Sequence, residues 1–149
     1  MEKFETCWED ADHPYLQPLS DTPDHNPGAE PFCSTTDKEI LGQVLNSYDQ
    51  ETVDFYRWET TYDRKTLSEL VSRRSGVNIG EILEIVPLER GLSGRIYRLK
   101  IVGSEKTIIV GKELEIRRIL SESHLKSSAF EVKMEDDRII LEGSGWGHG

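Results

Sequence analysis

The chain has 149 residues, of which 36% are hydrophobic and 31% charged, a balance typical of one globular domain that excludes a fully disordered chain. Its net charge is −10, and because an acidic chain repels phosphate backbones, we expect no nucleic-acid partner. No stretch reaches the ~20 apolar residues that span a bilayer, and the polar residues after Met1 do not form a signal peptide.

Residues 1–35 are predicted to be an ordered, extended segment that lies on the core. Proline fixes φ and removes a backbone donor, which excludes a regular helix through Pro14, Pro18, Pro23, Pro27 and Pro31. The segment also holds both cysteines of the chain, too few for a disulfide scaffold, and they could be paired or be unrelated thiols. With the nearby histidines they match no familiar zinc spacing, so we expect no metal site and no cofactor.

Residues 36–80 are predicted to form a helix, a strand and a second helix. Thr36 and Glu39 make a capping box, which favours a helix over 37–47. The β-branched and aromatic residues of 53–62 are typical of a strand.

A second capping box, Thr66 with Glu69, predicts a helix that ends at Gly76. Residues 33–66 are the least diagnostic part of the chain, and the segment 36–80 could be an insertion found in one lineage.

Residues 81–149 are predicted to be mostly β. The expected strands are 82–86, 96–102, 107–110, 130–134 and 138–141, with a short helix over 114–120. Turn signals at 103–106 and at Asp136-Asp137 indicate hairpins. The predicted fold class is therefore α+β, with mostly antiparallel β hairpins and two or three short helices.

The C-terminal end is glycine-rich: Gly143, Gly145, Gly147 and Gly149 alternate with Ser144, Trp146 and His148. Each glycine loses much backbone entropy on folding, so the repeat indicates a φ that only glycine adopts, or a ligand close to the main chain. A dinucleotide-binding G-x-G-x-x-G would need glycine at position 148, and no Gly-Lys pair of a phosphate loop is present.

Two side chains in this repeat carry chemistry. An indole ring stacks on the apolar face of a sugar, and a histidine donates, accepts or carries a proton near neutral pH. The alternative is a glycine-rich β turn with a buried tryptophan and a hydrogen-bonded histidine.

Gly-Trp-Gly-His-Gly at 145–149 resembles the signature core of SpoIID/LytB domains, which are bacterial cell-wall modules. Further segments resemble the same family in the same order: Trp8 with Pro14-Tyr15-Leu16, Ser93-Gly94-Arg95, Arg117 with Leu120, and Leu125, Ser127, Ser128 and Phe130. In that family the glycine motif continues further, so we expect a partial domain, cut at both ends.

The resemblance implies that the parent protein is a peptidoglycan lytic transglycosylase, which cleaves MurNAc-GlcNAc bonds to 1,6-anhydro products. The alternative is a non-catalytic, peptidoglycan-binding enhancer of a cell-wall amidase. The family's catalytic glutamate lies in an N-terminal segment that nothing in this chain matches, so no residue here is assigned as catalytic and the chain alone is expected to be inactive.

The resemblance places a group of residues of this chain in a substrate cleft. These are Trp146, His148, Gly145, Gly147, Ser127, Ser128, Arg95 and Arg117. The two arginines could pair with muramyl or peptide carboxylates, or form internal ion pairs. The implied partners are glycan strands and a cell-wall hydrolase, which would put the parent outside the cytoplasm. A third reading is a complete, acidic, cytosolic α+β domain.

Overall fold

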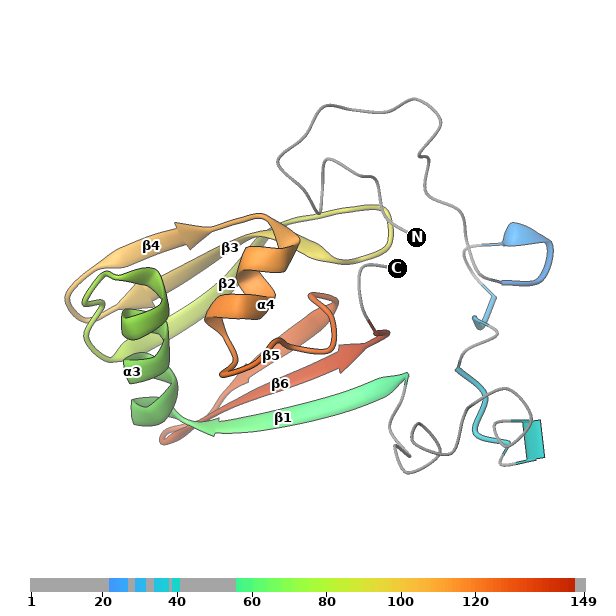
Figure 1. Ribbon diagram of the computed structural model, residues 1–149, viewed down its shortest axis with the longest axis horizontal. Helices are drawn as coiled ribbons and strands as arrows, with labels where there is room; N and C mark the ends of the chain where they lie inside the picture. Colours follow the sequence, from blue (N-terminus) through green and yellow to red (C-terminus); the bar gives the residue numbers. More distant parts are fainter. Residues whose placement is uncertain (1–21, 27–28, 32–33, 38, 41–55, 147–149) are drawn as a thin grey trace.

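The computed structural model describes residues 22–26, 29–31, 34–37, 39–40 and 56–146. Its elements are η1 (Pro23–His25), β1 (Arg57–Asp63), α3 (Arg64–Ser75), β2 (Ile82–Arg90), β3 (Ile96–Gly103), β4 (Thr107–Val110), α4 (Glu113–Ile119), β5 (Phe130–Met134) and β6 (Arg138–Ser144). The strands form two three-stranded antiparallel sheets, ordered β1-β6-β5 and β2-β3-β4 (Figure 1). The predicted α+β fold, dominated by antiparallel hairpins, is confirmed.

The first sheet has β6 at its centre. The predicted β5–β6 hairpin is confirmed, and its turn closes where the Glu135 N–H donates to the Arg138 carbonyl at 2.9 Å. On the other side β6 pairs with β1 along its whole length, from Arg57 opposite Ser144 to Asp63 opposite Arg138. A strand distant in sequence therefore lies beside the strand that enters the glycine-rich end.

The second sheet is built from two consecutive hairpins. The predicted turn at 103–106 is confirmed, because the Gly103 N–H donates to the Lys106 carbonyl at 3.0 Å. β2 pairs with β3 with register shifts between Pro87 and Arg90, so this end of the hairpin is irregular, next to the loop that precedes Ile96.

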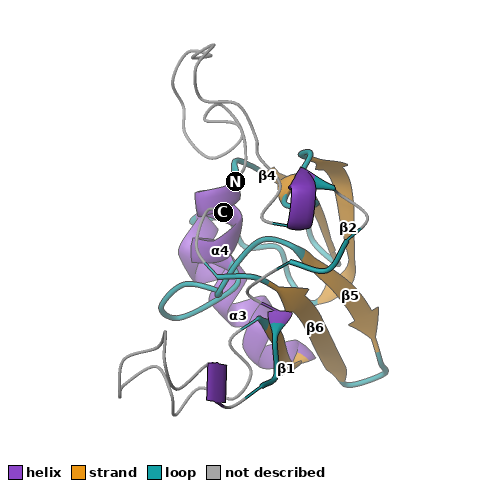
Figure 2. Cartoon of the chain, turned by 90° about the vertical axis from the view of Figure 1, so that its right-hand side faces the viewer, coloured by secondary structure: helices purple, strands orange, loops and turns teal. Residues whose placement is uncertain are grey.

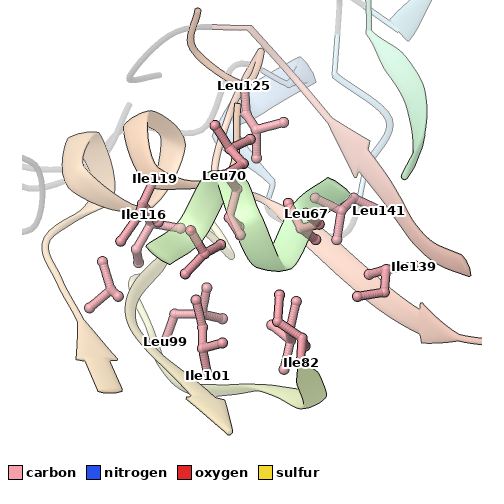
Figure 3. Packing of buried hydrophobic residues seen from close by; sticks show 14 of the residues in the cluster. Leu67, Leu70, Ile82, Leu99, Ile101, Ile116, Ile119, Leu125, Ile139 and Leu141 are labelled. Carbon is pink, nitrogen blue, oxygen red and sulfur yellow. The ribbon is translucent and has the colours of Figure 1, made fainter. Parts of the chain in front are cut away.

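The hydrophobic core lies between the two sheets and the two helices. α4 packs on β3, while α3 contacts α4, β1 and β2, and Figure 2 shows the two helices next to each other. Each buried aliphatic side chain contributes about 1.5–3 kcal/mol. Figure 3 shows this packing through Leu67, Leu70, Ile82, Leu99, Ile101, Ile116, Ile119, Leu125, Ile139 and Leu141, all buried.

Helix α3 begins earlier than its capping box predicts. Its N-cap is Asp63 rather than Thr66, while the end at Gly76 is confirmed, with φ of 70°. The Arg64 N–H donates to the Asp137 carbonyl at 2.8 Å, so a tertiary contact satisfies one of the helix donors that a cap would otherwise satisfy. The chain passes directly from the end of β1 at Asp63 into α3 at Arg64, so residues 64–66 are already helical where the capping box predicted the helix to begin.

Several predictions concern residues outside the described part of the chain. They include most of the helix over 37–47, most of the extended segment over 1–35, and both cysteines. The strand expected over 53–62 is described from Arg57, and it ends at Asp63. β1 and α3, which belong to the segment that could be an insertion, contribute Trp58, Leu67, Leu70 and Val71 to the core.

Arg64 joins the two sheets. Its guanidinium donates to the Ile82 carbonyl of β2 at 2.8 Å and to the Glu135 carbonyl after β5 at 2.5 Å. Its side chain is mostly buried, although arginine is usually an exposed residue. It connects backbone groups of both layers.

We expect Arg64→Met to lower the free energy of unfolding by about 2 kcal/mol, because two carbonyls lose a charged donor while the aliphatic stem still packs. Urea unfolding measures the change. Arg73→Met is the matched control, since Arg73 is exposed and its partner among the described residues is exposed Glu122, an interaction of about 0–1 kcal/mol. Equal losses in the two variants would contradict the bridging role.

Candidate functional site

Gly143 gives Trp58 the space it occupies. Trp58 and Phe130 lie on the two sides of Gly143 in the sheet register, and their ring centroids are 6.3 Å apart. A Cβ at position 143 would stand 2.1 Å from Cζ2 of Trp58. The first glycine of the repeat therefore permits close approach of a buried indole and needs no ligand to explain it.

Gly145 serves a different purpose. Its φ is +76°, a conformation that residues with a Cβ adopt only at a cost. Its N–H donates to the Tyr56 carbonyl at 2.6 Å, and its carbonyl accepts the Trp58 indole N–H at 3.2 Å. Trp58 thus holds both Gly143 and Gly145, and the chain turns here before Trp146.

The loop that precedes β5 is tied to the same end of β6. The Ser127 hydroxyl donates to the Ser144 carbonyl at 2.6 Å and accepts the Ala129 N–H at 3.1 Å. The next residue, Ser128, is fully buried, and its carbonyl accepts the Ile96 N–H at 3.0 Å. Ser127 and Ser128 are therefore brought beside the glycine-rich end, where Ser127 holds the loop in place.

Arg117 lies further from the glycines and supports this loop. Its Nε donates to the Leu125 carbonyl at 2.6 Å, and its Nη1 is 3.5 Å from a carboxylate oxygen of buried Glu113. Of the two roles left open by the sequence, the internal ion pair is the one present in the structure.

Arg95 lies against Gly145. Its Nη2 is 3.4 Å from the position that a Cβ at Gly145 would occupy, and the residue is only 7% exposed. Its Nε is buried and has no hydrogen-bond partner among the described residues. Unlike Arg117, this guanidinium is brought directly to the glycine-rich end.

Trp146 is the exposed aromatic residue of the site. The side chain is 48% exposed, and the Lys126 ammonium lies 5.4 Å from the ring centroid. A cation near an indole is attracted to the face of the ring, so Lys126 steadies a ring that remains open to solvent. Gly147, His148 and Gly149 lie outside the described residues.

A groove of about 840 Å³, here called the sheet-end groove, adjoins these residues. This volume lies in the range of small-molecule sites. Its walls include the start of β1, the end of β6, the start of β5 and the Ser93-Gly94 loop. A second hollow of about 920 Å³ lies at the start of α3 and contains none of the predicted site residues.

Charges of both signs lie around the sheet-end groove. Glu59, Glu142 and Glu131 are neighbours across three strands, an arrangement that is unfavourable unless cations compensate it. Arg90 pairs with Glu131, and Lys133 donates a hydrogen bond to Glu142. That bond, together with the charge of Glu142, raises the pKa of Lys133 above its ordinary value. The groove therefore offers both donors and acceptors.

The described part of the chain was not found to contain a metal cluster or a membrane-spanning helix. There, no three His, Cys, Asp or Glu side chains lie in a group that could hold a metal ion. Within the same residues no helix is long and apolar enough to cross a membrane.

One family model matches residues 2–149, and the family is described as a domain of unknown function, DUF8618. The chain belongs to this family. No curated protein matches the chain. The match includes every described element together with the glycine-rich end, so the site and the scaffold that holds it belong to the same family domain.

Trp58 is the residue of the site that sequence reasoning misses. Its pattern predicts only a strand position, yet its ring and indole N–H organise Gly143 and Gly145. The sequence offers one signal for the role of Trp58. A tryptophan inside a strand needs space on a neighbouring strand, and the alternating glycines that follow another strand of this chain can give that space.

Proposed function

We propose that the protein acts in the bacterial cell wall as a SpoIID/LytB-type protein, and that its glycine-rich end forms part of a glycan-binding cleft. The observation that carries this proposal is the exposed ring of Trp146, held beside Lys126 at the end of β6. An exposed indole beside a lysine suits a sugar, whose apolar face stacks on the ring while its hydroxyls and amides take hydrogen bonds.

The activity we propose for the parent protein is lytic transglycosylase. A single acid serves this reaction: it protonates the leaving glycosidic oxygen, then accepts the proton of the muramyl 6-hydroxyl as that oxygen closes the 1,6-anhydro ring. We assign this role to no residue of the chain, because none matches the glutamate-bearing segment of SpoIID/LytB domains. The residues proposed here bind and orient the glycan.

We expect Trp146→Ala to weaken binding to purified sacculi about tenfold, since loss of ~1.4 kcal/mol of ring contact corresponds to that factor. A pull-down with sacculi across protein concentrations measures this. Ile109→Ala is the matched control, because Ile109 is 58% exposed and lies on β4, in the sheet that does not carry the glycine-rich end. If the wild-type protein stays in the supernatant at every concentration, the proposed function is wrong.

Two further assays separate the enzyme from the alternative, an enhancer of a cell-wall amidase. Release of anhydro-muropeptides from sacculi by the parent protein supports the transglycosylase. Binding without release, together with faster turnover by an added amidase, supports the enhancer. If the folded parent protein shows neither release nor stimulation, both activities are excluded.

A further inference from the structure

We propose that Arg95 forms an anion subsite at the glycine-rich end, and that its ligand is a carboxylate of the bound polymer. The identity of the polymer rests on the function proposed above. The subsite itself rests on the burial of Arg95, on its position, and on the charges that surround it.

The first observation is that Arg95 is buried without full compensation. An arginine stays charged at any physiological pH, and a buried donor without a partner is costly. Arg95 is 7% exposed and its Nε has no partner among the described residues, whereas buried Arg117 pairs with Glu113 and Leu125. The same fold therefore compensates one buried guanidinium and leaves the other incompletely bonded.

The second observation is where Arg95 lies. Its Nη2 lies 3.4 Å from the position that a Cβ at Gly145 would occupy, so the guanidinium lies beside that residue. The sheet-end groove is lined by Ser93 and Gly94, which precede Arg95, and by Ser144, which precedes Gly145. A ligand that extends from the groove past Ser144 toward Gly145 would approach the guanidinium beside a backbone that carries no side chain.

The third observation is charge. The chain carries a net charge of −10, yet Arg95 and Lys126 both lie at the end that presents Trp146. Two cations and an aromatic ring in an acidic protein suit an acidic sugar or a peptide carboxylate. A planar guanidinium binds a carboxylate through two parallel hydrogen bonds, which a neutral sugar does not offer.

The test compares two sugars that differ in one group. N-acetylmuramic acid is N-acetylglucosamine with a lactyl ether that ends in a carboxylate, and both are titrated into the chain while backbone amide NMR shifts are followed. We expect the acid to bind about tenfold tighter, as one charge-assisted contact allows. Arg95→Gln should abolish this preference, Arg95→Lys should retain part of it, and exposed Arg98→Gln should retain it fully.

A measurement on the wild-type chain removes the dependence on variants that fail to fold. The methyl ester of N-acetylmuramic acid keeps the sugar and the ether but has no charge. It should bind as weakly as N-acetylglucosamine. If the ester and the acid bind alike, and D-alanyl-D-alanine shows no Arg95-dependent binding either, the subsite does not exist.

The remaining outcomes separate the subsite from the proposed function and identify the source of the carboxylate. Arg95-dependent binding of D-alanyl-D-alanine, without that of N-acetylmuramic acid, assigns the carboxylate to the peptide and supports the subsite. Sacculus binding that Arg95→Gln leaves unchanged overturns the subsite alone. Arg95-dependent binding of N-acetylmuramic acid without sacculus binding overturns the proposed function and keeps the subsite.

Discussion

Trp58→Ala should lower the free energy of unfolding by about 3–5 kcal/mol, the range for a large buried aromatic residue. Trp58 is 4% exposed, packs against Phe130, and donates its indole N–H to the Gly145 carbonyl. Truncation would leave a cavity between β1 and β5 and would release the turn that precedes Trp146. Urea unfolding monitored by far-UV circular dichroism measures the loss.

Trp146→Ala is a matched control, because it removes the same side chain from a position that is 48% exposed. We expect it to change the free energy of unfolding by less than about 1 kcal/mol. Trp58→Phe should fall between the two, since it keeps an aromatic ring but loses the hydrogen bond. Equal stability of Trp58→Ala and Trp146→Ala would contradict the anchoring role of Trp58.

Gly143→Ala should destabilise the protein by about 3 kcal/mol, at the upper end of what overpacking of a core costs. The added methyl group would lie 2.1, 2.4 and 2.6 Å from Cζ2, Cε2 and Cη2 of Trp58. These atoms belong to a ring that is itself enclosed, so it cannot move aside freely. The measurement is again the shift of the urea midpoint.

The control for backbone effects is Gly76→Ala. Gly76 has φ of +70° and open space around its Cβ position, so alanine there costs about 1 kcal/mol of strain without a clash. A double-mutant cycle with Trp58→Phe isolates the clash. Because phenylalanine lacks the three contacting atoms, Gly143→Ala should cost much less in that background. Additive effects would rule out the steric account of Gly143.

Local patterns predicted most of the secondary structure. The hairpins around 103–106 and around Asp136 lie where turn signals interrupt β-rich runs. Helix α3 ends at Gly76, which adopts the left-handed conformation that glycine favours at a helix end. These features depend on a few consecutive residues, so the sequence contains all the information needed to place them.

The start of α3 shows where this local information stops. Its capping box favours Thr66 as the N-cap, but the backbone of the β5–β6 turn reaches the Arg64 N–H and the helix begins earlier. A capping box is worth about 1 kcal/mol, and a tertiary hydrogen bond together with burial of Leu67 outweighs it. No inspection of neighbouring residues could reveal the contact.

The site divides in the same way. The sequence by itself identified the alternating glycines, Trp146 as an aromatic side chain that can stack on a sugar, and the arginines and serines of the site. These are properties of residue type and spacing. Only the tertiary structure decided that Gly143 accommodates Trp58 and that Arg117 pairs with Glu113. It also decided that Arg95 lies beside Gly145 with an Nε that has no hydrogen-bond partner in the described part of the chain. Those outcomes depend on which strands lie side by side, and pairing of β1 with β6 joins residues far apart in the chain. The energy of such contacts appears only when the sheets form, so residue order alone does not show it.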